Sequence, residues 1–205
     1  IICFVTTSTA GEVWVANMKG ANVEVIDTGS NKIINTIATG AGAHNVTFSP
    51  DGKLAYIANL GTNSITIIDT ATKEKLADVL TDTKAHDVAV SPDGKIAVSC
   101  NVGAGNITFI DVASKKATHT MSTGKKAITA VFSPDGKTLY VSLWGGDKVA
   151  LVDVDNNIVH SAIPVGSHPN DMTLTKDGRY LFISQGNDNS VSVIDTKTEK
   201  VIEVF

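Results

Sequence analysis

Apolar and polar residues alternate along most of the chain in short runs, which are separated by small clusters of turn residues. In the stretch from 43 to 84, the runs 44–48, 54–58, 64–69 and 75–80 are rich in Val, Ile, Thr and aromatic residues. A period of two is typical of half-buried strands, and no stretch shows the 3.6-residue period of an amphipathic helix. The pattern predicts four short antiparallel strands in this stretch.

One turn recurs after the first strand of each such unit. Ser-Pro-Asp-Gly-Lys occupies residues 49–53, 91–95 and 133–137, and the weaker form Thr-Lys-Asp-Gly-Arg occupies 175–179, always 42 residues apart. Pro presets the second turn position, Asp bonds its own backbone, and Gly accepts a positive φ. An Asp-Gly turn between alternating runs predicts a hairpin.

The 42-residue period extends over the whole chain. Asp27, Asp69, Asp111, Asp153 and Asp195 follow it without an insertion or deletion. A fixed period of this size indicates a repeat architecture, and four antiparallel strands per repeat of about 40–45 residues are typical of a propeller blade. We therefore predict an all-β fold, a β-propeller of four-stranded antiparallel blades forming a single domain over residues 1–205. The expected blades are approximately 1–42, 43–84, 85–126, 127–168 and 169–205.

The two ends of the chain bear on the number of blades. The first copy is expected to open with a strand at residues 1–6, and its turn at 7–11 lacks Pro and Asp. The last copy stops inside a fourth strand. Most propellers close by completing one blade with strands from both ends, and no shared blade is evident here. Together with the missing initiator Met, this favours five blades of a larger wheel of seven. A closed five-bladed ring is the alternative.

Composition excludes several classes of partner. The net charge is −4 without a basic patch, so no nucleic acid partner is expected. No apolar run approaches the roughly 18 residues of a membrane span. The two cysteines, Cys3 and Cys100, are too few for a disulfide framework.

Several short motifs together resemble the YVTN-type β-propeller repeat of surface-layer and periplasmic proteins. They are Trp14-Val15-Ala16-Asn17, Tyr56-Ile57-Ala58-Asn59, Ile67-Ile68-Asp69-Thr70 and the Ser-Pro-Asp-Gly-Lys turns. The resemblance covers essentially the whole chain and implies an extracytoplasmic location, periplasmic or at the cell surface. Related wheels include the haem-d domain of nitrite reductases and sugar-lactone hydrolases, although a shared fold does not transfer a function.

Three histidines are candidates for holding a cofactor. His44 and His86 occupy the same repeat position, just before the innermost strand, and His168 lies two residues earlier in the fifth copy. Innermost strands line the channel of a propeller, so these imidazoles are expected near one opening. An axial ligand of a metal or tetrapyrrole would be such a histidine. The simpler interpretation is polar residues that line a wet channel.

Polar residues at the same opening are candidates for a binding face. They lie at the position of His44 and His86 or at the next one: Asn45, Asp87, Thr129, Asn170 and Asp171.

No motif indicates catalysis. A Cys-x-x-Cys-His haem attachment, zinc-spaced Cys/His, a Gly-x-Ser-x-Gly elbow and a P-loop do not occur in the sequence. We therefore predict no catalytic residues, no metal site and no resident cofactor, although haem or a metal remains open through the histidines.

The main interpretation is a non-catalytic extracytoplasmic interaction or scaffold propeller, more consistent with a binding protein than with an enzyme. It would bind a protein or small-molecule partner through one face. The first alternative is a haem- or metal-binding redox propeller resembling the haem-d nitrite reductase domain. The second is a lactonase-like hydrolase, for which Asp87 and Asp171 supply two of the several carboxylates that a cation would need.

Overall fold

Twenty strands account for the regular structure. The computed structural model describes the backbone of residues 3–5 and the whole of residues 11–205, and within these ranges it contains no helix. Residues 1–2 and 6–10 lie outside this description, so most of the predicted first-copy turn is not tested. In the described ranges, no helix is long and apolar enough to cross a membrane.

Each 42-residue copy forms one four-stranded antiparallel sheet whose strands follow chain order. In the second copy the strands are 43–48, 54–59, 64–69 and 75–80, which confirms the four strands predicted from the alternation. The five sheets are β1 (Cys3–Val5), β2 (Glu12–Asn17), β3 (Asn22–Asp27) and β4 (Lys32–Ala38); β5 (Ala43–Phe48), β6 (Leu54–Asn59), β7 (Ser64–Asp69) and β8 (Lys75–Leu80); β9 (Ala85–Val90), β10 (Ile96–Asn101), β11 (Asn106–Asp111) and β12 (Lys116–Ser122); β13 (Ala127–Phe132), β14 (Thr138–Leu143), β15 (Lys148–Asp153) and β16 (Ile158–Pro164); and β17 (Pro169–Leu174), β18 (Tyr180–Gln185), β19 (Ser190–Asp195) and β20 (Lys200–Val204).

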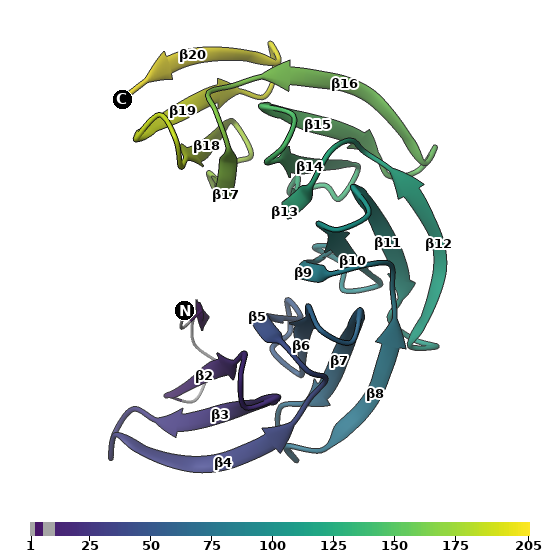
Figure 1. Ribbon diagram of the computed structural model, residues 1–205, viewed down its shortest axis with the longest axis vertical. Coiled ribbons are helices and arrows are strands. Elements are labelled where there is room, and N and C mark those ends of the chain that lie inside the picture. The colour runs from purple at the N-terminus through teal and green to yellow at the C-terminus, as the bar shows by residue number, and fades with distance from the viewer. Residues whose placement is uncertain (1–2, 6–10) are drawn as a thin grey trace.

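The five sheets stand side by side in an open arc, which confirms the β-propeller architecture (Figure 1). Strands β1, β5, β9, β13 and β17 line the concave side, and β4, β8, β12, β16 and β20 form the convex rim. The first and the last blade lie at the two ends of the arc. This shape is that of a partial propeller.

Apolar packing between neighbouring blades holds the arc together. Trp14 of the first blade is fully buried against Ile57 and other residues of the second, and Tyr140 of the fourth blade packs with Leu181 of the fifth. The second and third strands of the inner blades are buried on both faces, because each is covered by a blade on either side. The outermost strands are mostly exposed. This arrangement explains why the middle strands are the most continuously apolar.

The recurring turn has the predicted chemistry. Ser49 Oγ donates to Asp51 Oδ1 at 2.6 Å and accepts from the Leu54 N–H at 3.0 Å, and Gly52 has a φ of +71°. The same bonds recur at Ser91 and Ser133. These turns join the end of each innermost strand to the second strand. His44 and His86 lie at the opposite end of those innermost strands.

Candidate functional site

His44 and His86 each occupy a β-bulge. In the second blade Ala43 pairs with Asn59 and Asn45 with Ala58, so His44 between them has no partner across the ladder. In the third blade Asp87 pairs with Cys100 and Ala85 with Asn101, which leaves His86 in the same situation. A bulge turns the side chain of the extra residue away from the regular alternation and is common beside active sites. The bulges therefore aim both imidazoles at the channel opening.

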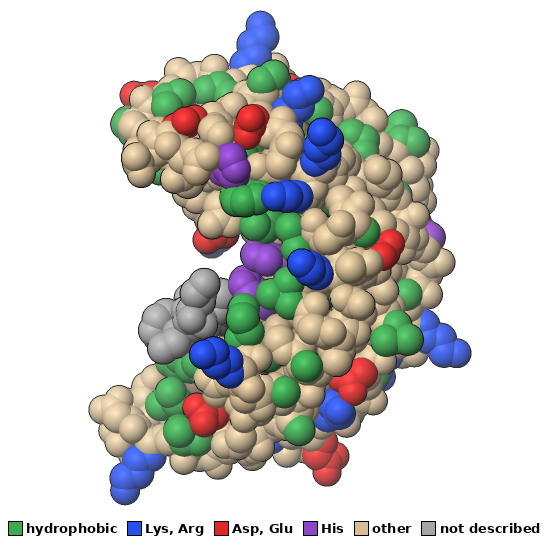
Figure 2. Space-filling model, viewed as in Figure 1, with side chains coloured by type: hydrophobic (Ala, Val, Ile, Leu, Met, Phe, Trp, Pro, Cys, Tyr) green, Lys and Arg blue, Asp and Glu red, His purple; other side chains and the backbone are tan. Residues whose placement is uncertain are grey.

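The two imidazoles are in contact and are fixed by backbone carbonyl groups. Their ring centroids are 4.1 Å apart with an angle of 43° between the ring planes. His44 Nδ1 lies 3.2 Å from the carbonyl oxygen of His86, and His86 Nδ1 lies 3.0 Å from that of Ile128. Because a carbonyl oxygen only accepts, both Nδ1 atoms carry the proton. Figure 2 shows histidine side chains gathered in the hollow of the crescent, with lysine side chains nearby on the same face.

Both histidines are neutral near pH 7. Burial lowers the pKa of His86 to about 4, with a further contribution from the nearby His44, and burial also lowers the pKa of His44. With Nδ1 donating to a carbonyl, Nε2 keeps its lone pair. Metal-bound histidines commonly have this arrangement, in which the second nitrogen is fixed by an outer hydrogen bond. These two residues therefore fit an iron or a haem group at the channel opening.

The channel wall next to the histidines is polar. Asn45, Asp87, Thr129 and Asp171 line one cavity of about 340 Å³, so the structure brings four of the five predicted face residues together. Asp87 is almost completely buried and accepts hydrogen bonds from Asn45 Nδ2 and, at 3.2 Å, from the Ala130 N–H. Burial raises the pKa of its carboxyl to about 6, and the charge of Asp171 adds to this effect.

Asn170 and His168 are placed differently from the other candidates. Asn170 is exposed and outside the lining of that cavity, and its carbonyl accepts from Ser142 Oγ at 2.9 Å. His168 packs edge-on against Trp144, with ring centroids 4.3 Å apart. Its Nδ1 lies 2.7 Å from Asn187 Nδ2, which donates, so the proton of a neutral His168 is on Nε2. That tautomer lacks the free Nε2 lone pair of His44 and His86.

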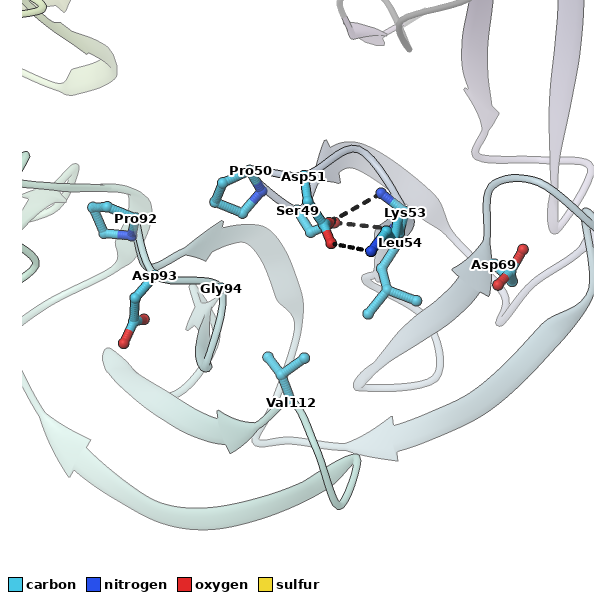
Figure 3. A pocket seen from close by; sticks show the side chains of 10 residues that line it. All are labelled: Ser49, Pro50, Asp51, Lys53, Leu54, Asp69, Pro92, Asp93, Gly94 and Val112. Carbon is cyan, nitrogen blue, oxygen red and sulfur yellow. Dashed lines mark hydrogen bonds and ion pairs between the residues drawn. The ribbon is translucent and has the colours of Figure 1, made fainter.

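The other end of the channel strands offers little chemistry. A groove of about 610 Å³ lies between the turns of the second and third blades (Figure 3). Asp51 and Asp93 bond the serine and backbone of their own turns, and Asp69 accepts from the Ala71 and Thr72 N–H groups. These carboxylates stabilise turns. Over the described residues, no group of three or more His, Cys, Asp or Glu side chains is arranged to hold a metal ion.

Comparison with known proteins decides the family. The sequence model described as the cytochrome D1 heme domain matches residues 11–204. The chain belongs to the cytochrome D1 heme domain family. No curated protein sequence matches it.

Solved structures of other proteins share the fold. A chain of hydrazine synthase from Kuenenia stuttgartiensis is similar with a TM-score of 0.84 and 20% identity, over 96% of this chain and 63% of that one. The dihydro-haem d1 dehydrogenase NirN, solved in complex with DHE, is similar with a TM-score of 0.77 and 19% identity, over 98% of this chain and 45% of that one. This chain thus spans less than two thirds of either protein. At these identities the similarity shows the fold alone.

Membership of this haem-domain family corrects the sequence-based interpretation. The scaffold propeller without catalysis was the main interpretation, and it is wrong, because the matching family is defined by a haem domain. The prediction of no resident cofactor is corrected for the same reason. The propeller expected from the YVTN-type resemblance is confirmed at the level of the fold, whereas the family that matches is a different one.

The strand pattern alone did not lead us to predict the two bulges, although the sequence contains a signal for them. Regular alternation breaks where two polar residues follow each other, in Ala43-His44-Asn45-Val46 and in Ala85-His86-Asp87-Val88. Two consecutive polar residues inside an alternating strand indicate an extra residue. The contact between the two rings had no such signal, because it depends on how closely neighbouring blades approach.

Asp87 and the histidines are expected to change stability in opposite directions over the same pH range. Because the pKa of Asp87 is raised in the folded protein, the free energy of unfolding should decrease by about 3 kcal/mol as pH rises from about 4 through 6. Because the pKa of His86 is lowered in the folded protein, the free energy of unfolding should decrease as pH falls from about 6.5 towards 4. The decrease should be about 2 kcal/mol after allowance for partial exposure. The wild-type free energy of unfolding should therefore change little over this range.

Asp87→Asn should remove the contribution of the carboxylate and leave that of His86 to the pH dependence of stability. Its free energy of unfolding, measured by urea denaturation, should increase by about 2 kcal/mol between pH 4 and 6.5. Asp135→Asn, which alters an exposed turn at the other end of the strands, should keep the wild-type profile between pH 4.5 and 6.5. A flat profile for Asp87→Asn would show that burial does not perturb these groups as described.

Proposed function

We propose that this chain is part of a propeller that binds a haem d1-type tetrapyrrole at the channel opening beside His44 and His86. The observation that carries the proposal is the pair of bulge-held imidazoles, each with Nδ1 fixed and Nε2 available. Membership of the cytochrome D1 heme domain family and the similarity to NirN support it. A bound haem would supply one-electron redox chemistry.

His44 and His86 are the residues that would hold the haem. Both are neutral at pH 7, so each presents an Nε2 lone pair that can ligate iron or accept a proton from a molecule bound there. Exposed Lys84 and Lys126 lie on loops at the same end of the channel. Their ammonium groups suit the carboxylate side chains of a tetrapyrrole.

An extracytoplasmic location is part of this proposal. Its support is the YVTN-type repeat resemblance, and fractionation of cells that produce the natural protein tests it. The small-molecule partner at one face would then be the haem itself.

The test is haem binding by the natural, full-length polypeptide that contains this chain. Ferric haem d1 and, separately, ferric protoporphyrin IX are titrated into the haem-free protein, and the visible spectrum is recorded. We expect a saturable shift of the absorption bands at one haem per protein. The shift should be absent from the double variant His44→Ala/His86→Ala. His119→Ala is the matched control, because His119 is exposed on β12 and stacks on Phe109. A spectrum that remains the sum of free haem and protein would overturn the proposal.

A further inference from the structure

Two chains of hydrogen bonds connect the same three blades. The first joins side chain to backbone, from His44 Nδ1 to the His86 carbonyl and from His86 Nδ1 to the Ile128 carbonyl. The second runs through the carboxylate of Asp87, which accepts from Asn45 Nδ2 of β5 and from the Ala130 N–H of β13. Both chains of hydrogen bonds begin on β5, pass through β9 and end on β13.

Among the described residues at this repeat position, Asp87 is the one whose side chain is hydrogen-bonded to both neighbouring blades. Asp171, at the same repeat position in the fifth blade, is exposed, and its carboxylate accepts from its own neighbour, the Met172 N–H, at 2.9 Å. Thr129 uses its backbone N–H within its own blade, towards Ser142 Oγ at 3.2 Å. The bridging carboxylate therefore occurs where the paired histidines occur, although the repeat offers the same position elsewhere.

The position of Asp87 makes it sensitive to the spacing of the blades. It follows His86 directly in β9 and is 4% exposed, so water does not replace its partners. Burial of a carboxylate is unfavourable unless its oxygens are well hydrogen-bonded. Both oxygens are used here, one on each side of β9. Any change in the distance from β5 or β13 to β9 therefore breaks a bond of Asp87 and also moves the carbonyl that holds an imidazole.

We propose that Asp87, with Asn45, is a positioning brace that sets the spacing of the second, third and fourth blades and thereby orients His44 and His86. It acts through the backbone, by holding the strands that carry the two imidazoles at a fixed distance. Its role in haem binding rests on the proposed function, whereas its effect on the two imidazoles does not. The brace keeps both Nδ1 atoms on their carbonyls, which leaves both Nε2 atoms without protons.

The test reads the histidines directly in the haem-free protein. Nitrogen NMR of the imidazoles at pH 7.5 reports which ring nitrogen carries the proton. In the wild type, both His44 and His86 should show the Nδ1–H form. In Asp87→Ala, both should gain signals of the Nε2–H form, and Asp87→Asn should give a smaller change, because it keeps one acceptor. Asp171→Ala is the matched control and should retain the wild-type signals.

A second variant keeps the proposal testable if Asp87→Ala does not fold. Asn45→Ala removes one donor from a half-buried position and leaves the Ala130 bond in place, so it should change the tautomer of His44 more than that of His86. His119 should be unaffected in every variant. Wild-type imidazole signals in folded Asp87→Ala or in Asn45→Ala would overturn the proposal.

Haem affinity provides a separate readout. Asp87→Ala should disturb the carbonyl bonds that hold the two imidazoles. Loss of such outer bonds typically weakens metal binding by about 10–100-fold, and we expect a loss in this range. If the wild type binds no haem, the proposed function fails, while the NMR result still shows whether Asp87 positions the two imidazoles. If the wild type binds haem and folded Asp87→Ala binds equally well with unchanged imidazole signals, the brace fails alone.

Discussion

His86→Ala is expected to weaken haem binding by about 100-fold or more, above the 10–100-fold that loss of an outer partner costs. The variant removes one Nε2 from the channel opening. It also removes the ring that packs against His44, with ring centroids 4.1 Å apart. The carbonyl of residue 86 remains, so His44 keeps its own hydrogen bond. Titration of the haem-free protein with ferric haem d1, followed by absorption, measures the change.

Two comparisons make this prediction specific. Added imidazole should restore part of the spectrum of His86→Ala, because it supplies the missing nitrogen, and His119→Ala should bind haem like the wild type. Wild-type binding should persist as pH falls from 7 to 5 and decrease towards pH 4, because the lowered pKa of His86 delays protonation of Nε2. An unchanged affinity in His86→Ala would remove this residue from the site.

Trp14→Ala is expected to lower the free energy of unfolding by about 3–5 kcal/mol, the usual cost of removing a large buried aromatic side chain. The indole is fully buried between the first two blades and meets Phe48 edge-on, with ring centroids 5.6 Å apart. Its N–H donates to Glu12 at 3.2 Å, and the Lys73 ammonium lies 5.0 Å above the ring. Urea denaturation followed by circular dichroism gives the measurement.

Trp144→Ala is the matched control for the loss of the buried Trp14 side chain. Trp144 is half-buried on the loop between β14 and β15, and it contacts Lys126 and His168 on the surface. Its removal should cost about 1–2 kcal/mol, as is common for partly exposed sites. Equal losses in the two variants would mean that the interface between the first two blades contributes no more to stability than a surface loop.

The repeat made the fold predictable. Strand alternation and the Ser-Pro-Asp-Gly-Lys turns are local properties, because pleat, proline φ and glycine freedom depend on neighbours in sequence. A period of 42 residues then placed every blade without a template. The strands at 43–48 and 54–59 agree with the predicted runs to within one residue at each end.

The site was predictable only in part. Repeat position placed His44, His86 and Asp87 at one opening, since innermost strands line a propeller channel. The same reasoning grouped His168 and Asn170 with them. In the structure His168 packs on Trp144, and Asn170 is exposed and does not line the cavity of Asp87. Loop conformation decided this outcome, and His168 has a φ of +57° that no strand pattern predicts.

The sequence by itself determined the all-β class, the division into four-stranded repeats and the turn chemistry, because each of these follows from local alternation repeated at a fixed period. Tertiary structure alone decided the contact between the two imidazoles, the tautomer of each and the bridging of three blades by Asp87. Those properties depend on the distances between the second, third and fourth blades, which the packing of residues such as Tyr56 and Val88 sets. They also depend on burial, which shifts the pKa values of His86 and Asp87.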